Sequence, residues 1–194
     1  MAPPPQGSGV SPAQRALAEL WWRPGGRMDA GWWPRLEMEA WRGDYQRRSA
    51  LRPALDGMLA KRLGQDGALP ALSAEAEALL ADDGRRGALC LSLGLWALGC
   101  PDYLLLRAYR APLAAHLDAA ALARLPALLP TRAGAVAEWT PEALCGEALR
   151  HGGAWLARAE DPAVAACRLH WAPLERAPRA DSPLPALRKL LKWL

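Results

Sequence analysis

Four side chains in the second half of the chain are of types that bind metal ions: Cys145, His151, Cys167 and His170. Cys167 and His170 lie three residues apart and can share one face of a helix. Cys145 and His151 lie six residues apart, which on a helix points them in different directions. Structural zinc sites usually take their ligands in closely spaced pairs. We therefore interpret these residues as buried thiols and surface imidazoles, and we expect no metal.

Catalytic groups are equally sparse in the sequence. Nucleophilic catalysis needs a nucleophile, a base and an orienting group that converge in a cleft. The candidate acids lie at expected helix ends or on polar faces, where the helix dipole or water stabilises their charge; they are Asp82, Asp83, Glu142 and Glu147. Gly84 and Gly87 flank two arginines, without the lysine and hydroxyl of a phosphate-binding loop. We predict no catalytic residue and no cofactor, and a small helical enzyme remains an alternative.

The elements that would position any site are helices, because the chain lacks the residues that favour strands. It contains no Ile, no Phe and no Asn, while Leu, Ala and Arg, which favour helices, are abundant. Its β-branched residues are Val10, Val136, Val164, Thr131 and Thr140. The composition predicts an all-α fold, a single irregular helical domain of about eight helices with no sheet, from apolar periodicity and cap signals.

Proline and glycine dominate residues 1–10, which we expect to be disordered, and residues 11–194 form the single helical domain. Ser11, Pro12 and Gln14 are a typical helix start. The stretch 87–110 predicts two helices joined at Cys100-Pro101, the first apolar almost all round and therefore buried. Later helices are expected over 118–125, 140–159 and 161–171, before a basic amphipathic segment at 183–194.

Charge and hydropathy also restrict the partners and the compartment. The chain carries 24 basic against 20 acidic residues with both signs interspersed, so we expect no nucleic-acid binding. Residues 1–10 lack the basic and apolar regions of a signal peptide. The most apolar run, residues 88–100, is far shorter than the ~20 residues of a membrane span. We predict a cytoplasmic protein without a membrane span.

Three groups of residues are candidate partner contacts. Trp32 and Trp33 belong to a tryptophan cluster whose spacing is not a helical stripe, so some members are exposed hot spots or, alternatively, cap one end of a bundle. The first group adds three arginines for an acidic partner, Arg23, Arg27 and Arg35. The second group is the acidic pair Asp82 and Asp83, and the third is Arg188, Lys189 and Lys192. The helix carrying the third group docks on the domain or a partner, or lies on an acidic membrane surface.

Three stretches resemble a known family. They are LWWRPGGRMDAGWWPRL at residues 20–36, SALRPAL with LCLSLGLWALGC at residues 49–55 and 89–100, and GAWLARAEDPAVAACRLHWAP at residues 153–173. They resemble the cytosolic sorting-platform accessory proteins of type III secretion, of the SctK/YscK type. The first stretch is similar to that family's Trp- and Pro-containing N-terminal segment, and the second to its Leu-rich helix. The third is similar to its late helix with an acidic-Pro break.

This resemblance implies an adaptor that has no enzymatic activity and binds no cofactor. Proteins of this type link the cytoplasmic domain of the inner-membrane ring protein to the pod protein beneath it, which connects through a linker protein to the ATPase. The implied location is the cytoplasmic face of the inner membrane. A helical secretion chaperone, or another protein-binding module, is the first alternative.

Overall fold

The chain folds into helices throughout the part that the computed structural model describes, residues 9–65, 67–130, 134–176 and 178–194. Helices, with the 3-10 turns included, make up 67% of the described residues, and these residues contain no strand. The all-α prediction is confirmed. Within these residues there are twelve α-helices rather than about eight, because turns isolate short pieces such as α2 and α7. Residues 1–8 of the segment expected to be disordered lie outside the described residues.

The helices follow one another through short connections. In chain order they are α1 (Pro12–Trp22), α2 (Trp32–Arg35), α3 (Glu39–Arg47), α4 (Arg52–Leu63), α5 (Ala74–Leu80), α6 (Asp83–Leu98), α7 (Asp102–Leu105), α8 (Arg107–Leu113), α9 (Ala119–Leu128), α10 (Pro141–Leu156), α11 (Pro162–Ala166) and α12 (Leu184–Trp193). Three 3-10 turns accompany them: η1 (Pro24–Gly26), η2 (Ser49–Leu51) and η3 (Cys167–His170).

Caps read from the sequence fix several of these boundaries. The Ser11 hydroxyl accepts the Gln14 N–H, and the Gln14 side chain accepts the Ser11 N–H, which completes a capping box at α1. Asp82 caps α6 by accepting the Arg85 N–H at 2.7 Å. Ser49 begins η2, and α4 starts at Arg52 without a side-chain cap.

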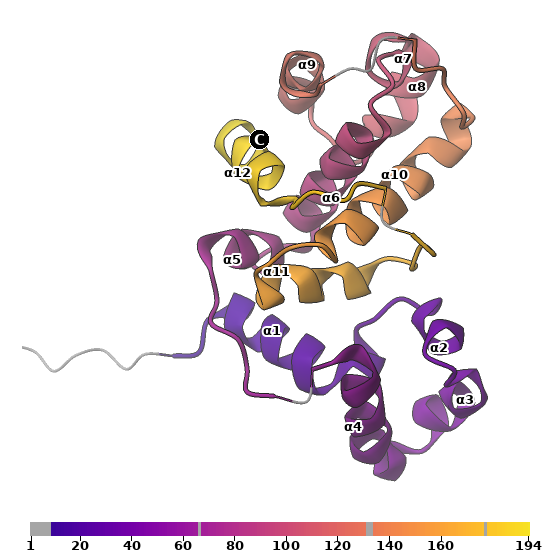
Figure 1. Ribbon diagram of the computed structural model, residues 1–194, viewed down its shortest axis with the longest axis vertical. Helices are drawn as coiled ribbons and strands as arrows, with labels where there is room; N and C mark the ends of the chain where they lie inside the picture. The colour runs from indigo at the N-terminus through magenta and orange to yellow at the C-terminus, as the bar shows by residue number, and fades with distance from the viewer. Residues whose placement is uncertain (1–8, 66, 131–133, 177) are drawn as a thin grey trace, which may run out of the picture.

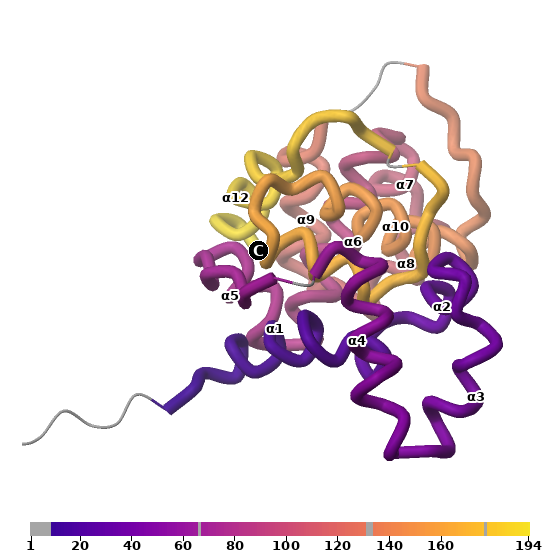
Figure 2. The backbone as a smooth tube through the Cα atoms, turned by 60° about the horizontal axis from the view of Figure 1, so that its bottom comes forward, coloured from indigo at the N-terminus to yellow at the C-terminus, as the bar shows by residue number. Residues whose placement is uncertain are grey.

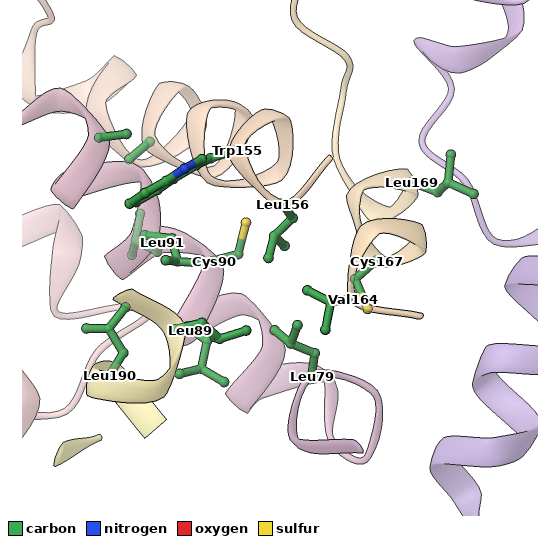
Figure 3. Close-up of a cluster of buried hydrophobic side chains, with 14 of the residues drawn as sticks. Leu79, Leu89, Cys90, Leu91, Trp155, Leu156, Val164, Cys167, Leu169 and Leu190 are labelled. Carbon is green, nitrogen blue, oxygen red and sulfur yellow. The ribbon is translucent and has the colours of Figure 1, made fainter. Parts of the chain in front are cut away.

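The centre of the molecule is the pair α6 and α10, which pack along each other through small residues. A Cβ atom at Gly94 would overlap the Ala148 carbonyl, and one at Gly152 would overlap the Cys90 carbonyl. The two helix backbones can approach this closely only because glycine has no side chain. Figure 3 shows Cys90 and Leu156 facing the same buried space, beside Val164 of α11.

The remaining helices cover this pair at two ends of a long axis. Figure 1 shows α7, α8 and α9 at one end and α3 and α4 at the other, with α6 and α10 between them. The view in Figure 2 again places α3 and α4 at the margin of the molecule. Helix α1 packs against α4, α5 and α11, and α12 packs against α5, α6 and α9. The two ends are therefore separate surfaces of one helical body.

Candidate interaction surfaces

The tryptophans of the N-terminal cluster divide between the core and the surface. Trp33 is only 3% exposed, and its ring packs on Tyr45 with 5.3 Å between the ring centroids. Trp32 is partly buried, and its indole N–H donates to the Trp171 carbonyl at 2.9 Å. Packing in the core therefore occupies the Trp33 ring, and a partner contact at Trp32 or Trp33 stays a prediction. Trp32 joins two segments of the chain.

A different tryptophan stands at the surface. Trp22, the last residue of α1, is 51% exposed, whereas the preceding Trp21 is buried. Successive residues of a helix point about 100° apart, so one of these two rings enters the core and the other faces away from it. Trp41 of α3 is also exposed, at 46%. The doublet at residues 21–22 shows that one of the two must be exposed, but not which one.

Trp22 lines a groove of about 540 Å³ between the end of α1, η1 and α4, which we call the Trp22 groove. Its lining residues are Glu19, Trp22, Arg23, Gly26, Arg27, Tyr45, Ser49, Arg52, Pro53 and Asp56. Two of the three predicted arginines, Arg23 and Arg27, are thus brought together, while Arg35 lies exposed on α2 outside the lining. Arg27 pairs with Glu19.

A buried carboxylate forms the floor of the groove. Asp56 accepts a hydrogen bond from the Tyr45 hydroxyl at 3.1 Å and one from the Gly25 N–H at 3.0 Å. Burial raises the pKa of Asp56, and it raises the pKa of Tyr45 to about 12. Asp56 and Tyr45 thereby tie α3, η1 and α4 together, and a Cβ at Gly25 would press on the Tyr45 ring.

The acidic pair at the start of α6 stabilises its own helix. Asp82 caps the helix, and Asp83 forms an ion pair with Arg86 at 2.8 Å. The Asp83 side chain is nevertheless largely exposed. Negative charge is favourable near a helix N-terminus, so this position accounts for both acidic residues without a partner protein. A partner contact at Asp82 or Asp83 stays a prediction.

The basic C-terminal helix α12 docks on the domain with its apolar face. Leu187 and Leu190 are buried, and two of the three basic candidates have intramolecular partners. Arg188 pairs with Glu75 at 2.5 Å, and Lys189 donates to the Leu128 carbonyl at 2.8 Å while lying over the Trp96 ring. Lys192 is exposed beside Trp193. The leucine face is therefore covered by this chain's own helices.

A second surface, which the sequence reading missed, lies where α7 meets α8. Leu105 and Leu106 are 63% and 49% exposed, and Arg107 and Arg110 are exposed beside them. We call these four residues the α7–α8 patch; three of them line a hollow of about 320 Å³. The sequence signal was the run Leu104-Leu105-Leu106 ahead of an arginine, since three consecutive residues of a helix cannot all face one core.

The four residues first considered as metal ligands do not converge. Within the described residues, no group of three or more His, Cys, Asp and Glu side chains is placed to hold a metal ion. Cys167 is a buried free thiol, and burial raises its pKa to about 12. Burial lowers the pKa of His170 to about 4, and Arg86 contributes in the same direction. These groups are inert core residues in this fold.

Across the described residues, this is an all-helical protein whose exposed aromatic and leucine side chains stand among arginines at two separate places. Among those residues every helix is too short or too polar to span a bilayer. A family model described as a type III secretion system subunit matches residues 15–170, and the chain belongs to that family. The resemblance read from the sequence is confirmed at this level. Searches of the curated proteins and of the solved structures found no match.

Proposed function

We propose that this chain is a non-enzymatic cytosolic adaptor of the sorting platform, of the SctK/YscK type. It links the cytoplasmic domain of the inner-membrane ring protein to the pod protein, and through it to the linker protein and the ATPase. The observation that carries the proposal is the family match over residues 15–170, a secretion-system subunit family rather than an enzyme family. Binding at the cytoplasmic face of the inner membrane follows from the ring partner.

The arrangement of the two surfaces supports a bridging role. The Trp22 groove is formed by α1, η1 and α4, and the α7–α8 patch lies at the other end of the long axis in Figure 1. Arginine, which both surfaces expose, and tryptophan, which the Trp22 groove exposes, are enriched in binding hot spots. Two such surfaces on separate ends allow two partners to bind at the same time.

The test is reconstitution from three purified proteins: this chain, the cytoplasmic domain of the ring protein and the pod protein. We expect each partner to co-purify with the chain, and all three to elute as one ternary complex in size-exclusion chromatography with light scattering. Partners that displace each other would contradict a bridge. A chain that retains a secreted effector and neither platform component would instead be a helical chaperone, the alternative raised by its exposed apolar surface.

A further inference from the structure

We infer that the Trp22 groove is the docking site for an acidic segment of a partner protein, one that carries Asp or Glu next to an apolar side chain. The inference rests on the proposed adaptor function and names what one of its two surfaces recognises.

The excess of basic over acidic residues lies in the first third of the chain. Residues 1–64 contain ten Arg and Lys against six Asp and Glu, whereas residues 65–194 contain fourteen of each, so the formal net charge of +4 belongs entirely to residues 1–64. These residues form α1 to α4, the helices around the groove. A field of one sign steers partners of the opposite sign toward such a surface.

Inside the groove the negative groups are already engaged. Glu19 pairs with Arg27, and Asp56 is buried beneath the Tyr45 hydroxyl and the Gly25 N–H. Asp56 also lies close enough to Arg23 and Arg52 for their charges to act on it, so it offsets part of their charge. The groove lining still holds three arginines, Arg23, Arg27 and Arg52, against two carboxylates, and this surplus of positive charge favours an acidic partner.

Two arginines in the groove form no direct ion pair with any described residue. Arg23 is exposed, and its side chain makes no hydrogen bond or ion pair with any described residue. Arg52 donates to the Tyr45 carbonyl at 2.9 Å and to the Gln46 carbonyl at 3.0 Å, both of which are neutral groups. A guanidinium fork held in this way is suited to a carboxylate, which it can bind through two parallel hydrogen bonds.

Trp22 supplies the apolar half of the contact. It lines both the groove and a second hollow of about 230 Å³, and Arg23 and Glu19 also line both. Arg15 lines the second hollow, so both depressions that share the Trp22 side chain contain arginine. An extended segment bound here can cover the indole with an apolar side chain and place carboxylates beside the arginines. Burying an aromatic ring among charge-assisted hydrogen bonds is the usual composition of a hot spot.

An acidic protein segment fits this surface better than nucleic acid does. Neighbouring basic residues on α3 are interleaved with acids: Arg42 pairs with Glu39, and Arg47 and Arg48 pair with Asp44. A nucleic-acid footprint requires basic charge clustered along one face. Here the unpaired charge is local, at Arg23 and Arg52, and is accompanied by an exposed ring.

The experiment uses fluorescein-labelled 15-residue peptides tiled across the ring protein's cytoplasmic domain and the pod protein, with binding to the full chain followed by fluorescence anisotropy. We expect the tightest peptides to be acidic, to weaken when Asp and Glu become Asn and Gln, and to weaken with added salt. Trp22→Ala and Arg23→Glu should each lower the affinity about tenfold or more.

Matched controls are available on the same protein. Trp41→Ala removes another exposed tryptophan and Arg176→Glu reverses another exposed arginine, both outside the groove lining and outside the α7–α8 patch. Both control variants should bind the peptides within about twofold of wild type, since neither residue contacts the groove. Circular dichroism should show wild-type helicity for all four variants.

Three results would overturn the inference: groove and control variants that bind alike, neutral peptides that bind as well as acidic ones, or a DNA duplex or phosphatidylserine vesicles that displace the acidic peptide. The groove and the adaptor function fail separately. Full-length partners that bind Trp22→Ala and Arg23→Glu normally would leave the adaptor standing and remove the groove. Acidic peptides that bind the groove while no ternary complex forms would keep the groove as a docking site and remove the adaptor function.

Discussion

The α6–α10 pair and the α1–α4 region (residues 12–63) are held together in different ways. The pair is joined by buried leucines and by glycines that let the backbones touch. The α1–α4 region also buries leucines such as Leu17 and Leu59, but it adds polar ties such as Asp56 with Tyr45, and it keeps exposed tryptophans and unpaired arginines. The α6–α10 pair is thus the scaffold, and the α1–α4 region carries the exposed binding surface. Substitutions in the first should cost stability, and substitutions in the second should cost binding.

Leu95 gives the largest expected difference between the two kinds of position. It is buried in α6, so Leu95→Ala should lower the free energy of unfolding by about 2–5 kcal/mol through lost burial and a residual cavity. Leu105→Ala, at an exposed leucine, is the matched control and should change it by less than about 0.5 kcal/mol. Urea denaturation followed by circular dichroism measures both. A loss below about 1 kcal/mol for Leu95→Ala would show that α6 is peripheral.

Gly94 tests the close approach itself. A Cβ at this position meets backbone atoms of Ala148 that cannot move without separating the helices, so Gly94→Ala should cost about 3 kcal/mol. Gly146 of α10 is exposed and has open space around its Cα, so Gly146→Ala should stabilise by about 0.5–1 kcal/mol through helix propensity. Equal effects of the two substitutions would mean that glycine packing does not define the α6–α10 pair.

The sequence predicted what local rules govern. Cap residues such as Ser11 and Asp161 and the buried character of residues 88–100 follow from propensity and periodicity, and the structure has them in place. Gly94 and Gly146 look alike in sequence, because only the approach of another helix makes one of them indispensable. Trp22 and Trp33 were not separable either, since Trp22 ends α1 just before η1 and Trp33 lies within the single turn of α2, and these placements follow from tertiary packing.

The candidate site was predictable only in part. Arg23 and Arg27 were correctly grouped by proximity in the chain, but their groove also needs Arg52 and Asp56, which α4 brings from some thirty residues away. No local pattern reports such a contact. The charge segregation at residues 1–64 was visible in the sequence and could have directed attention to this region before the structure did.

His170 lies between the α6–α10 pair and the α1–α4 region, and we expect it to make stability depend on pH. The folded-state pKa is about 4 against 6.5 for an ordinary histidine, because the ring is buried and Arg86 and Arg27 outweigh Asp83. Between these values the unfolded chain binds a proton that the folded chain excludes. Stability is therefore complete above about pH 6.5 and is lost as pH falls, by on the order of 2 kcal/mol at pH 5.

The check is denaturant unfolding at pH 7.5, 6 and 5 for the wild type and for His170→Leu, which keeps an apolar side chain there and removes the titration. The difference between the two proteins should shrink or reverse in favour of the leucine variant as pH falls. Parallel pH curves would show that His170 has the same pKa in the folded and the unfolded protein, and that the junction next to Trp171 is open to water.

Tyr45 gives the smallest expected effect and is the test most able to break the comparison. Tyr45→Phe keeps the ring against Trp33 and removes the hydroxyl from Asp56. Asp56 would still accept the Gly25 N–H, and water can reach its carboxylate because Asp56 lines the groove. The loss in unfolding free energy should therefore be roughly 1 kcal/mol, well below that of a stranded buried charge. Acidic-peptide affinity should stay within about twofold of wild type, since Trp22 and Arg23 are untouched. A loss above about 3 kcal/mol would show that one polar tie holds the α1–α4 region as firmly as packing holds α6 to α10, and the division between scaffold and surface would fail.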